Sequence, residues 1–533
     1  MNTRLLRADR AEDLAAAAAL LRSGGLVAIP TETVYGLAAN ALDPAAVTRI
    51  FEAKGRPQDN PLIVHVASME EIPPLVARVD PRLPALAAAF WPGPLTVIMK
   101  KSDRIPAVVS AGLDTVAIRM PSHPTARAVI AAAGVPLAAP SANASGRPSP
   151  TCAAHVLHDL DGRIDAVLEG GESEVGVEST VITLTTEPPT LLRPGGVTPE
   201  QLENVLGRIQ ISPAVFSALR AGETAQSPGM KYKHYAPRTA VTLVQGSFEQ
   251  FRQFVNAQKT PVCAVCFHGE GSCFAHAIEY GASGDGKAQA HDVFDALRRI
   301  DAVGCSRALV RCPDPAGVGL AVYNRLLRAA AFRVIDLRIR IPVLGLTGQT
   351  GAGKSTVAAM LAARGCAVID CDQVAREVVA LPAVQAALYD AFGGDILRDG
   401  KLDRRLLARR AFADAAHTAA LNEITHPEIT RLTVEAIHKA EADGAVTAVI
   451  DAALLLDSDL TALCGRILSV IAPDDVRLAR ICARDGISEA DGRLRMAAQP
   501  PTSYYIENAD LVLQNDGDLA ALRQAVDAVD LSS

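Results

Sequence analysis

The stretch from Val343 to Thr356 reads VLGLTGQTGAGKST and determines how the last part of the chain is interpreted. Its first four residues form an apolar run, which is typical of a buried parallel strand. The pattern G-x-x-x-x-G-K-S that follows is a phosphate-binding P-loop, whose glycines let backbone N–H groups converge on a phosphate. A helix that begins near Lys354 would point its positive end at the same phosphate.

This loop predicts a nucleotide site with Lys354 on the β- and γ-phosphate oxygens, as a catalytic residue, and with Ser355 as a Mg²⁺ ligand. ATP and Mg²⁺ are therefore the expected cofactors. The predicted nucleotide contacts in the loop are Gly348, Gly351, Ala352, Gly353, Lys354, Ser355 and Thr356.

Composition limits the kind of protein. A chain of 533 residues is too long for one core and predicts three or four domains. The net charge is −7 and no long Lys/Arg run exists, so we expect no stable nucleic-acid binding. No secretory signal and no apolar run of ~18 residues is visible, which predicts no membrane association. Ten scattered cysteines fit a reducing, cytoplasmic location.

Helical and strand-like runs alternate along the chain, which predicts an α/β fold throughout. Residues 1–208 read as a mixed α/β domain, 209–238 as a connector, 239–338 as a small Rossmann-like α/β domain and 339–533 as a P-loop domain with a parallel sheet. Ile335–Ile341 reads as a strand that runs directly into the P-loop domain. The expected helices include Ala11–Arg22, Pro44–Lys54, Leu320–Ala331 and Val357–Arg364, and the expected strands include Gly25–Pro30, Pro61–Val66, Leu95–Lys100, Thr115–Arg119, Ser179–Leu184 and Pro261–Phe267.

Four polar clusters stand out in residues 1–208. They read PTETVYG (30–36), KGRP with a later NPL (54–62), PSANASG (140–146) and GVESTV with a later RPG (176–195). Cations, hydroxyls and amides at strand ends suit a nucleotide phosphate and a small polar substrate held together. Each residue alone is explained as well by a solvated arginine or a turn, so spacing alone does not name a reaction.

The order of these motifs, with WPGPLT and AIR between them, resembles the YrdC-like family of L-threonylcarbamoyladenylate synthases over nearly all of residues 10–208. The segments SPGMKYKHYAPR and PDPAGVGLAVYNRLLRAA resemble the longer form of that family, which has an extra C-terminal domain. The resemblance implies that L-threonine, bicarbonate and ATP are joined into threonylcarbamoyl-AMP, with release of pyrophosphate. The product would supply the threonylcarbamoyl group for an adenosine of tRNA. Downstream tRNA-threonylcarbamoyl transferase proteins, which would carry out that transfer, are the implied partners.

The same resemblance implies roles for individual residues. It places L-threonine on Thr33, His65, Arg119 and Ser179. It places ATP on Lys54, Arg56, Asn60, Thr115, Ser141, Asn143, Arg193 and Tyr235. Lys54 would neutralise phosphates and Tyr235, in the connector, would fold over the nucleotide as a lid. No nucleophilic side chain is needed, because positioning and charge neutralisation supply most of the rate.

Cys263 and Cys266, in PVCAVCF, have the content of a metal site. Residues three apart on a strand face opposite sides, so we interpret them as a buried structural pair rather than zinc ligands.

Two acids follow the apolar run Ala367–Asp370, beside the predicted P-loop. At the end of a strand, Asp370 and Asp372 can bind Mg²⁺ or take a proton from an acceptor hydroxyl. Val449–Asp451 is similar to a Walker B strand, a weak signal by itself. A later helix face with the spacing i, i+3, i+7 favours a lid over ATP, although a solvated face explains it nearly as well. That face carries Arg477, Arg480 and Arg484.

The pattern GLTGQTGAGKST, VIDCDQVAREVV, FGGDIL, LDRRLLARRAF and a later His-Pro pair resembles dephospho-CoA kinase over residues 341–529. The resemblance implies transfer of the γ-phosphate of ATP to the ribose 3′-hydroxyl of dephospho-CoA. Asp372 would be the catalytic base, Arg484 and Arg495 would contact ATP, and Asp370 is a second candidate for Mg²⁺. The family pattern D-x-P-L-L-x-E departs at Asp451–Asp457, which puts the acceptor contact at Asp457 in doubt.

The sequence therefore predicts two enzymes in one polypeptide. Two other interpretations remain open at this point: the first module binds RNA, or the last one phosphorylates a different small molecule, such as a nucleoside monophosphate.

Overall fold

The structure is a computed structural model that describes residues 2–217, 235–398 and 401–531. The chain forms two compact units. Unit 1 is Met1–Leu243 with Cys263–Arg333, and unit 2 is Val244–Val262 with Val334–Ser533. Most of the predicted connector, residues 218–234, lies outside the described residues. The bounds of the four predicted segments stay a prediction.

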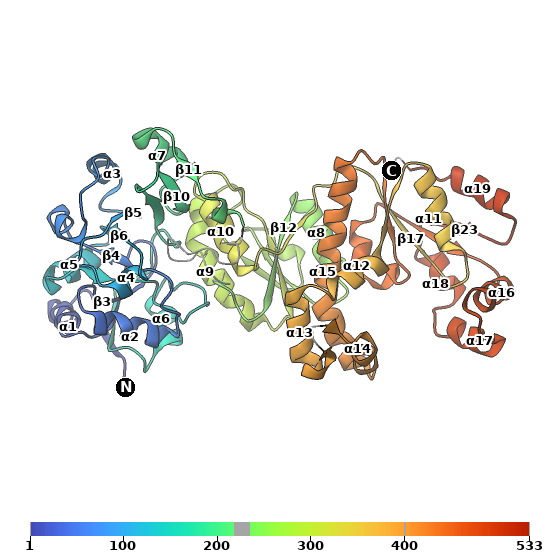
Figure 1. Cartoon of the computed structure of the whole chain (residues 1–533), viewed down its shortest axis with the longest axis horizontal. Helices are drawn as coiled ribbons and strands as arrows, with labels where there is room; N and C mark the ends of the chain where they lie inside the picture. The colour runs from blue at the N-terminus through green and yellow to red at the C-terminus, as the bar shows by residue number, and fades with distance from the viewer. Residues whose placement is uncertain (1, 218–234, 399–400, 532–533) are drawn as a thin grey trace. The chain divides into compact units, whose positions relative to one another are not determined.

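Unit 1 contains an eleven-stranded mixed sheet with the order β1-β8-β2-β3-β7-β4-β6-β5-β9-β10-β11 (Figure 1). The sheet contains both parallel pairs, such as β4 with β6, and antiparallel pairs, such as β5 with β6. The strands are β1 (Arg4–Arg7), β2 (Val27–Ile29), β3 (Gly36–Asn40), β4 (Ile63–His65), β5 (Leu95–Lys100), β6 (Thr115–Arg119), β7 (Leu137–Ala138), β8 (Ala166–Glu169), β9 (Thr180–Thr183), β10 (Thr190–Arg193) and β11 (Gln210–Ile211).

Both faces of this sheet are covered by apolar cores. Successive side chains of a strand point to opposite faces, and β2 shows this: Val27 and Ile29 lie in one core with helices α1 and α5, whereas Ala28 lies in the other core with α2. The helices are α1 (Ala11–Arg22), α2 (Pro44–Lys54), α3 (Leu83–Phe90), α4 (Ala107–Ser110), α5 (Pro124–Ala133), α6 (Ala153–Leu160) and α7 (Pro199–Leu206), with short 3-10 turns η1 (Met69–Glu71), η2 (Pro73–Leu75) and η3 (Pro213–Val215).

The middle part of the chain is also α/β. Strand β13 pairs in parallel with β14 and β15, which fits the predicted Rossmann-like arrangement. The elements of this part are β12 (Ala240–Gln245), α8 (Phe248–Asn256), β13 (Cys263–Cys266), η4 (Gly271–Cys273), β14 (Ala277–Glu279), α9 (Gly286–Val303), β15 (Arg307–Arg311), α10 (Gly319–Ala329) and β16 (Val334–Asp336).

Unit 2 contains a fully parallel five-stranded sheet with the order β18-β21-β17-β22-β23. Figure 1 shows α15 on one side of it and α11 with α19 on the other. The strands are β17 (Val343–Gly348), β18 (Ala367–Asp370), β21 (Ala448–Asp451), β22 (Arg466–Ile471) and β23 (Leu511–Gln514), with a separate hairpin of β19 (Leu397–Arg398) and β20 (Lys401–Leu402).

The helices of unit 2 surround this sheet. Residues of α11 and α19 join those of β17 and β22 in one core, so the sheet is buried as parallel sheets usually are. The helices are α11 (Lys354–Ala363), α12 (Cys371–Val378), α13 (Pro382–Phe392), α14 (Arg404–Ala411), α15 (Ala415–Ala442), α16 (Asp474–Asp485), α17 (Glu489–Ala497), α18 (Thr502–Glu507) and α19 (Leu519–Asp527), with η5 (Gly394–Ile396), η6 (Leu455–Asp457) and η7 (Asp459–Leu463).

One predicted strand is wrong. Ile335–Ile341 was expected to be extended throughout, but β16 ends at Asp336 and no strand resumes before Val343. The Asp336 side chain accepts hydrogen bonds from the backbone N and the guanidinium of Arg338, a local turn that competes with strand pairing. The predicted α/β fold class is confirmed.

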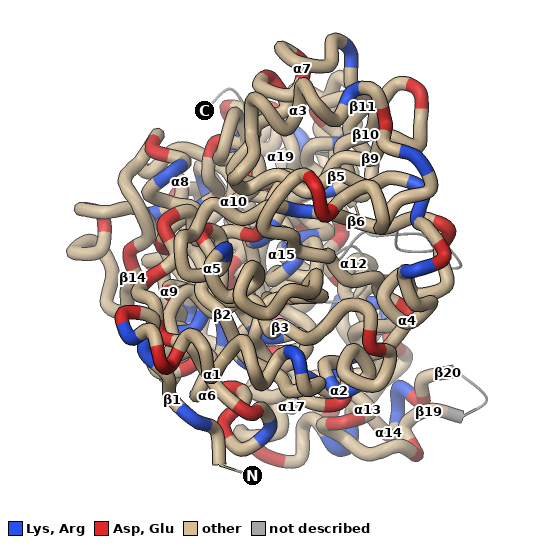
Figure 2. The backbone as a smooth tube through the Cα atoms, turned by 90° about the vertical axis from the view of Figure 1, so that its left-hand side faces the viewer, with Lys and Arg blue, Asp and Glu red and all other residues tan. Residues whose placement is uncertain are grey.

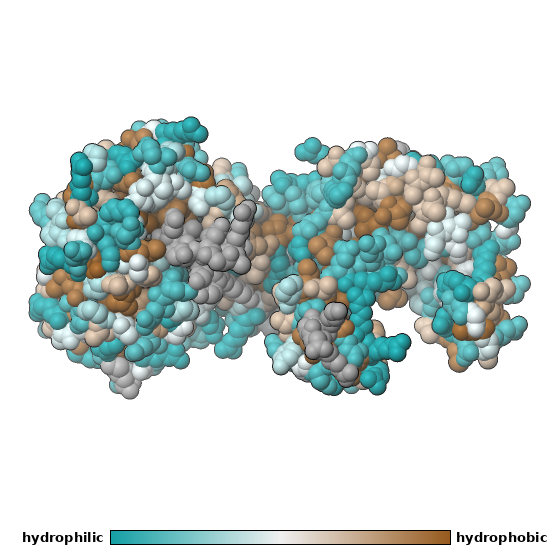
Figure 3. Space-filling model, viewed as in Figure 1, coloured by the Kyte–Doolittle hydropathy of each residue, from teal (hydrophilic) through white to brown (hydrophobic). Residues whose placement is uncertain are grey.

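Charge and hydropathy are mixed over the molecule. Figure 2 shows Lys and Arg interspersed with Asp and Glu along the backbone, and on the face seen in Figure 3 hydrophobic residues form scattered patches between hydrophilic ones. Within the described ranges, no helix has the length and apolar character needed to cross a bilayer.

Candidate active sites

Unit 1 contains a cavity at the ends of its central strands, with an empty volume of about 690 Å³ that includes space open to solvent. Ten of the twelve residues that the resemblance selects line it: Thr33, Lys54, Arg56, His65, Arg119, Ser141, Asn143, Ser179, Arg193 and Tyr235. These residues come from widely separated parts of the sequence, and the fold brings them together.

Asn60 and Thr115, both predicted as ATP contacts, do not line the cavity. Asn60 is buried next to Arg56, whose Nη2 donates to the Asn60 carbonyl at 3.4 Å. Thr115 is the first residue of β6, whereas Arg119, at its other end, reaches the cavity. Because the cavity lies at one end of β6, the two ends of the strand cannot both contribute.

Arg119 and His65 line the cavity, and Glu32, which does not line it, pairs with Arg119; all three are buried. Arg119 forms an ion pair with Glu32 at 2.7 Å. Burial and the positive charge of Arg119 lower the pKa of His65 to about 3, so its imidazole is neutral near pH 7. Glu32 was not predicted as a site residue, although it stands in the quoted PTETVYG motif.

Lys54 and Asn143 organise the loop that reads PSANASG. The Lys54 ammonium donates to the carbonyls of Ser141 and Asn143 at 2.5 Å, and the Ser141 hydroxyl donates to Asn143 Oδ1 at 2.6 Å. Burial lowers the pKa of Lys54 well below its ordinary value, and the neighbouring Arg56 lowers it further. Lys54 therefore fixes the loop as well as lining the cavity.

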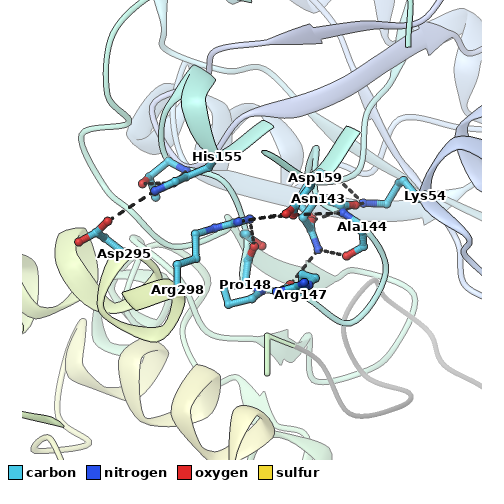
Figure 4. A network of polar contacts seen from close by, with 12 residues as sticks. Lys54, Asn143, Ala144, Arg147, Pro148, His155, Asp159, Asp295 and Arg298 are labelled. Carbon is cyan, nitrogen blue, oxygen red and sulfur yellow. Dashed lines mark hydrogen bonds and ion pairs between the residues drawn. The ribbon is translucent and has the colours of Figure 1, made fainter. Parts of the chain in front are cut away.

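A relay of contacts ties this loop to α9 of the predicted accessory domain (Figure 4). Arg298 on α9 pairs with Asp159 through two hydrogen bonds of 3.2 and 2.9 Å. Asp159 in turn accepts from the backbone N of Ala144, inside the loop, at 3.3 Å. The loop is thus held from both sides, by Lys54 and by α9.

The opposite wall of the cavity joins β9 and β10. The Arg193 guanidinium donates to the Ser179 carbonyl at 3.0 Å and to its Oγ at 3.1 Å. Burial lowers the pKa of Arg193 to about 10, which still leaves it charged near pH 7. A Cβ added to Gly195 would lie 2.6 Å from the Glu178 carbonyl, so the close approach of these two segments requires glycine there.

Two further contacts of the cavity wall involve Arg325, which was not predicted as a site residue. Arg325 on α10 is fully buried and its Nε donates to Glu178 Oε2 at 2.6 Å, across 147 positions of sequence. Tyr235, the predicted lid residue, is buried between Phe294, with ring centroids 5.2 Å apart, and the Arg325 guanidinium, 5.7 Å from the tyrosine centroid. The only signal in the sequence was the tail motif that contains NRLLR.

In unit 2 the P-loop joins β17 to α11, which begins at Lys354 as predicted. Gly353 has φ of +100° and a Cβ there would collide with the amide of Asn515, so glycine is required. Asn515 Nδ2 donates to the Ala352 carbonyl at 2.7 Å. Ser355 and Thr356 are exposed at the first turn of the helix.

One acid, Asp451, pairs with the P-loop lysine, and two further acids, Asp370 and Asp372, act on Asp451. Lys354 Nζ forms an ion pair with Asp451 Oδ1, at the end of β21. Burial raises the pKa of Asp451, and Asp370 and Asp372 raise it further against the opposing effect of Lys354. Asp370 caps α12 by accepting from the backbone N of Asp372 at 2.9 Å, and the Asp372 side chain is exposed.

The arginines of α16 and α17 divide into two groups. Arg477 Nε donates to the Thr350 carbonyl at 3.0 Å, and Arg480 Nη1 donates to the Ala352 carbonyl at 3.4 Å, so both lie on the P-loop. The predicted ATP contacts Arg484 and Arg495 are not brought to the loop. Both are largely exposed and pair with Asp485.

The acceptor contact that the departing motif put in doubt, Asp457, is exposed and accepts a hydrogen bond from the Tyr504 hydroxyl at 2.6 Å. This bond is the first cause that raises the pKa of Tyr504 to about 12.

Cys263 and Cys266 are both buried in β13, and burial raises the pKa of each thiol to about 12. Within residues 2–217, 235–398 and 401–531, no group of three or more His, Cys, Asp or Glu side chains could hold a metal ion.

Comparison with known proteins covers both units. A family described as telomere recombination matches residues 19–195, the C-terminal domain of threonylcarbamoyl-AMP synthase matches 197–331, and dephospho-CoA kinase matches 342–521. The threonylcarbamoyl-AMP synthase of Pyrococcus abyssi is 48% identical over 326 residues, 60% of this chain and 95% of the relative. A dephospho-CoA kinase of Corynebacterium glutamicum is 43% identical over 183 residues, 34% of this chain and 93% of the relative.

The chain belongs to both families. Among solved structures, the crystal structure of P. abyssi Sua5 complexed with L-threonine has a TM-score of 0.59 and 44% identity, covering 63% of this chain and 99% of that one. The predicted pair of enzyme families, in this order along the chain, is confirmed, and both families use ATP. No finding tests the individual site residues.

Proposed function

We propose that the chain is a bifunctional enzyme that forms threonylcarbamoyl-AMP in unit 1 and phosphorylates dephospho-CoA in unit 2. The observation that carries the first activity is the cavity, in which buried or partly buried cations from three separate motifs converge beside a neutral histidine. The observation that carries the second is the P-loop whose lysine pairs with Asp451, a carboxylate on which Asp370 and Asp372 also act.

In unit 1 the roles divide along the cavity. Thr33, His65, Arg119 and Ser179 hold L-threonine, and Arg119 is the partner of its carboxylate. Arg56, Arg193, Ser141 and Asn143 hold ATP, Lys54 neutralises phosphates while it fixes the loop, and Tyr235 closes over the nucleotide. Asn60 supports Arg56 from behind, and Thr115 takes no part.

The reaction in unit 1 proceeds without a nucleophilic side chain. The amine of threonine attacks CO₂ and releases a proton, or attacks bicarbonate and releases water, to give a carbamate. A carbamate oxygen then attacks the α-phosphorus of ATP, the bond from that phosphorus to the oxygen bridging to the β-phosphate breaks, and pyrophosphate leaves. Arg56 and Arg193 neutralise charge on the phosphates. The buried wall excludes water, and these charges act most strongly in a site without water.

In unit 2, Lys354 and the backbone N–H groups of residues 348–356 hold the ATP phosphates. The exposed carboxylate of Asp372 takes the proton of the ribose 3′-hydroxyl as that oxygen attacks the γ-phosphorus. Asp457, held by Tyr504, faces solvent and is available to the acceptor. Arg480 supports the loop at its carbonyl side.

The residues of unit 2 fit Mg²⁺, which proteins typically bind through one or two oxygen ligands together with the substrate phosphates. The exposed Ser355 hydroxyl and the carboxylates of Asp370 and Asp451 would hold it, and bound Mg²⁺ would neutralise charge on the transferred phosphate. The second carboxylate oxygen of Asp370 remains available to Mg²⁺, because only Oδ1 caps α12.

Downstream tRNA-threonylcarbamoyl transferase proteins are the proposed consumers of the product, and a cytoplasmic location fits the ten scattered cysteines of the chain. Neither an RNA-binding module nor a nucleoside monophosphate kinase is supported by any observation.

The test is direct. Purified protein is incubated with ATP and Mg²⁺, then with L-threonine plus bicarbonate, or with dephospho-CoA, and the products are identified by mass. Threonylcarbamoyl-AMP with pyrophosphate in the first reaction, and coenzyme A with ADP in the second, are expected. Absence of either product removes the corresponding activity from the proposal.

A further inference from the structure

Arg325 is a fully buried charge that the reaction described above does not use. It lies on α10 and donates to four acceptors: Glu178 Oε2 at 2.6 Å, the Glu178 carbonyl at 3.3 Å, the Pro194 carbonyl at 3.0 Å and Asn324 Oδ1 at 2.9 Å. Arg325 does not line the cavity, whereas Glu178 does. The guanidinium therefore contacts the cavity wall from its outer side.

Glu178 is an unusual member of that wall. The other charged groups that line the cavity, Lys54, Arg56, Arg119 and Arg193, are all positive, which suits the triphosphate of ATP. Glu178 is the exception, and it is buried. A carboxylate without a partner at this place would repel phosphate strongly, because Coulomb interactions are weakly screened inside a protein.

The surroundings of Glu178 keep it ionised. Burial alone would raise the pKa of its carboxyl, but Arg325 and then Arg193 bring it below the ordinary value. The groups that act on it come from several elements: Arg325 on α10, Arg193 on β10, Ser149, whose hydroxyl donates to Glu178 Oε1, Lys54 at the end of α2, and Tyr235.

We propose that Arg325 is a positioning residue of the synthase site: it neutralises Glu178 from the outer side of the wall, so that the cavity stays attractive to the ATP phosphates. The accessory domain thereby supplies a charge without which the ATP subsite is incomplete. This inference rests on the proposed synthase activity and adds one requirement to it.

A charge role and a packing role predict different signs. If Arg325 serves only to pack α10 against the cavity wall, then Arg325→Met and Glu178→Gln both loosen the wall and both raise the KM for ATP. If Arg325 neutralises Glu178, Arg325→Met exposes a negative charge and Glu178→Gln removes one, so the two variants move the KM for ATP in opposite directions.

The experiment measures threonine-dependent pyrophosphate release by full-length protein for both single variants and for the Arg325→Met/Glu178→Gln double variant. Arg325→Met should raise the KM for ATP about tenfold or more, in line with losing a charged hydrogen-bonded partner. Glu178→Gln should lower it or leave it unchanged. The double variant should return to within about threefold of the parent, because replacing a whole buried pair is far less harmful than breaking it.

The pH dependence gives a second readout. In Arg325→Met the carboxyl of Glu178 loses its main stabilising charge and takes up a proton more readily, so the KM for ATP should fall as pH is lowered from about 8 to about 6. The parent should show no such fall, because Arg325 keeps Glu178 ionised over this range.

Arg328→Met is the matched control, since Arg328 is a buried arginine on the same helix that donates to the Ala214 carbonyl at 2.8 Å and does not contact Glu178. It should leave the KM for ATP unchanged. L-threonine binding, measured by calorimetry, reports whether each variant keeps a folded cavity.

Three outcomes would overturn the inference. The first is an equal rise in the KM for ATP in both single variants, and the second is a KM for ATP in Arg325→Met within about twofold of the parent. If Arg325→Met does not fold, a tenfold rise in the KM for ATP in Glu178→Gln is the third. Failure of the parent protein itself to release pyrophosphate with threonine would instead remove the proposed function.

Discussion

The synthase cavity of unit 1 and the P-loop of unit 2 are both proposed to hold ATP, yet the chain builds them in different ways. The P-loop is a continuous stretch between β17 and α11. Ser355, in the first turn of α11, and Asp372, in α12, are both exposed. The cavity draws its cations from α2, β6, β10 and the segment after α2, and they are buried or nearly so. A local motif can therefore act with few supporting contacts, whereas the assembled cavity depends on groups far away in sequence.

This difference governs what single substitutions should do. In unit 2 a substitution removes one chemical function from an otherwise intact loop. In unit 1 a substitution also leaves a neighbouring buried charge without its partner, which costs additional free energy. The four predictions below test this contrast, and they run from the largest expected effect to the smallest.

Asp372→Asn should reduce coenzyme A formation by about 10²–10⁴-fold, because it removes the proton acceptor for the 3′-hydroxyl. ATP binding should persist, since Lys354 and the loop amides are unchanged. Steady-state kinetics with dephospho-CoA and a separate measurement of ATP affinity check this, and Lys354→Ala should by contrast weaken ATP binding as well.

Asp370 is the competing candidate for the base. If Asp372→Asn keeps near-parent turnover while Asp370→Asn abolishes it without loss of Mg·ATP affinity, the assignment of the base to Asp372 is wrong.

Arg56→Ala should weaken threonine-dependent pyrophosphate release about tenfold or more, in keeping with the ~1.5–3 kcal/mol of a charge-assisted contact. Coenzyme A formation by the same protein should be unaffected, which serves as the internal control. Normal pyrophosphate release would show that Arg56 does not contact ATP.

His65 should make the stability of unit 1 depend on pH. Its folded pKa of about 3 lies below the unfolded value of about 6.5, so the unfolded chain binds the proton more readily in between. The contribution is fully present above about pH 6.5 and is lost as the pH falls toward 3, by about 2 kcal/mol between pH 6.5 and pH 5.

Thermal or urea unfolding of the parent and of His65→Gln at several pH values measures this slope. A slope that is the same in both proteins would mean that His65 does not titrate as its buried position requires.

Arg480→Ala should raise the KM for ATP of the kinase a few-fold, because Arg480 contacts a P-loop carbonyl. Arg484→Ala should change it by less than about twofold, since an exposed ion pair such as that with Asp485 contributes about 0–1 kcal/mol. A larger effect at Arg484 than at Arg480 would favour a lid that closes over ATP, as the family resemblance implies.

The sequence predicted the continuous parts of the molecule well. The P-loop, the start of α11 at Lys354 and helices such as α1 and α2 follow from local patterns of glycines, caps and apolar spacing. Asn60 and Thr115, which the family resemblance selects, do not line the cavity, because the order of motifs in a sequence does not show which way each segment faces. Arg325 was missed because its partner Glu178 is 147 positions away and no local pattern marks such a pair.

The interleaving of the two units has a consequence for synthesis on the ribosome. Lys259, just after α8, donates its backbone N–H to the buried carboxylate of Asp459 at 2.9 Å, 200 positions later. At about 5–20 residues per second, Asp459 emerges roughly 10–40 seconds after Lys259. Helix α8 and the Lys259 N–H that follows it are therefore synthesised well before their partner segment of unit 2 exists. A kinase fragment that starts at residue 341 would be translated without that segment and would leave Asp459 without this donor.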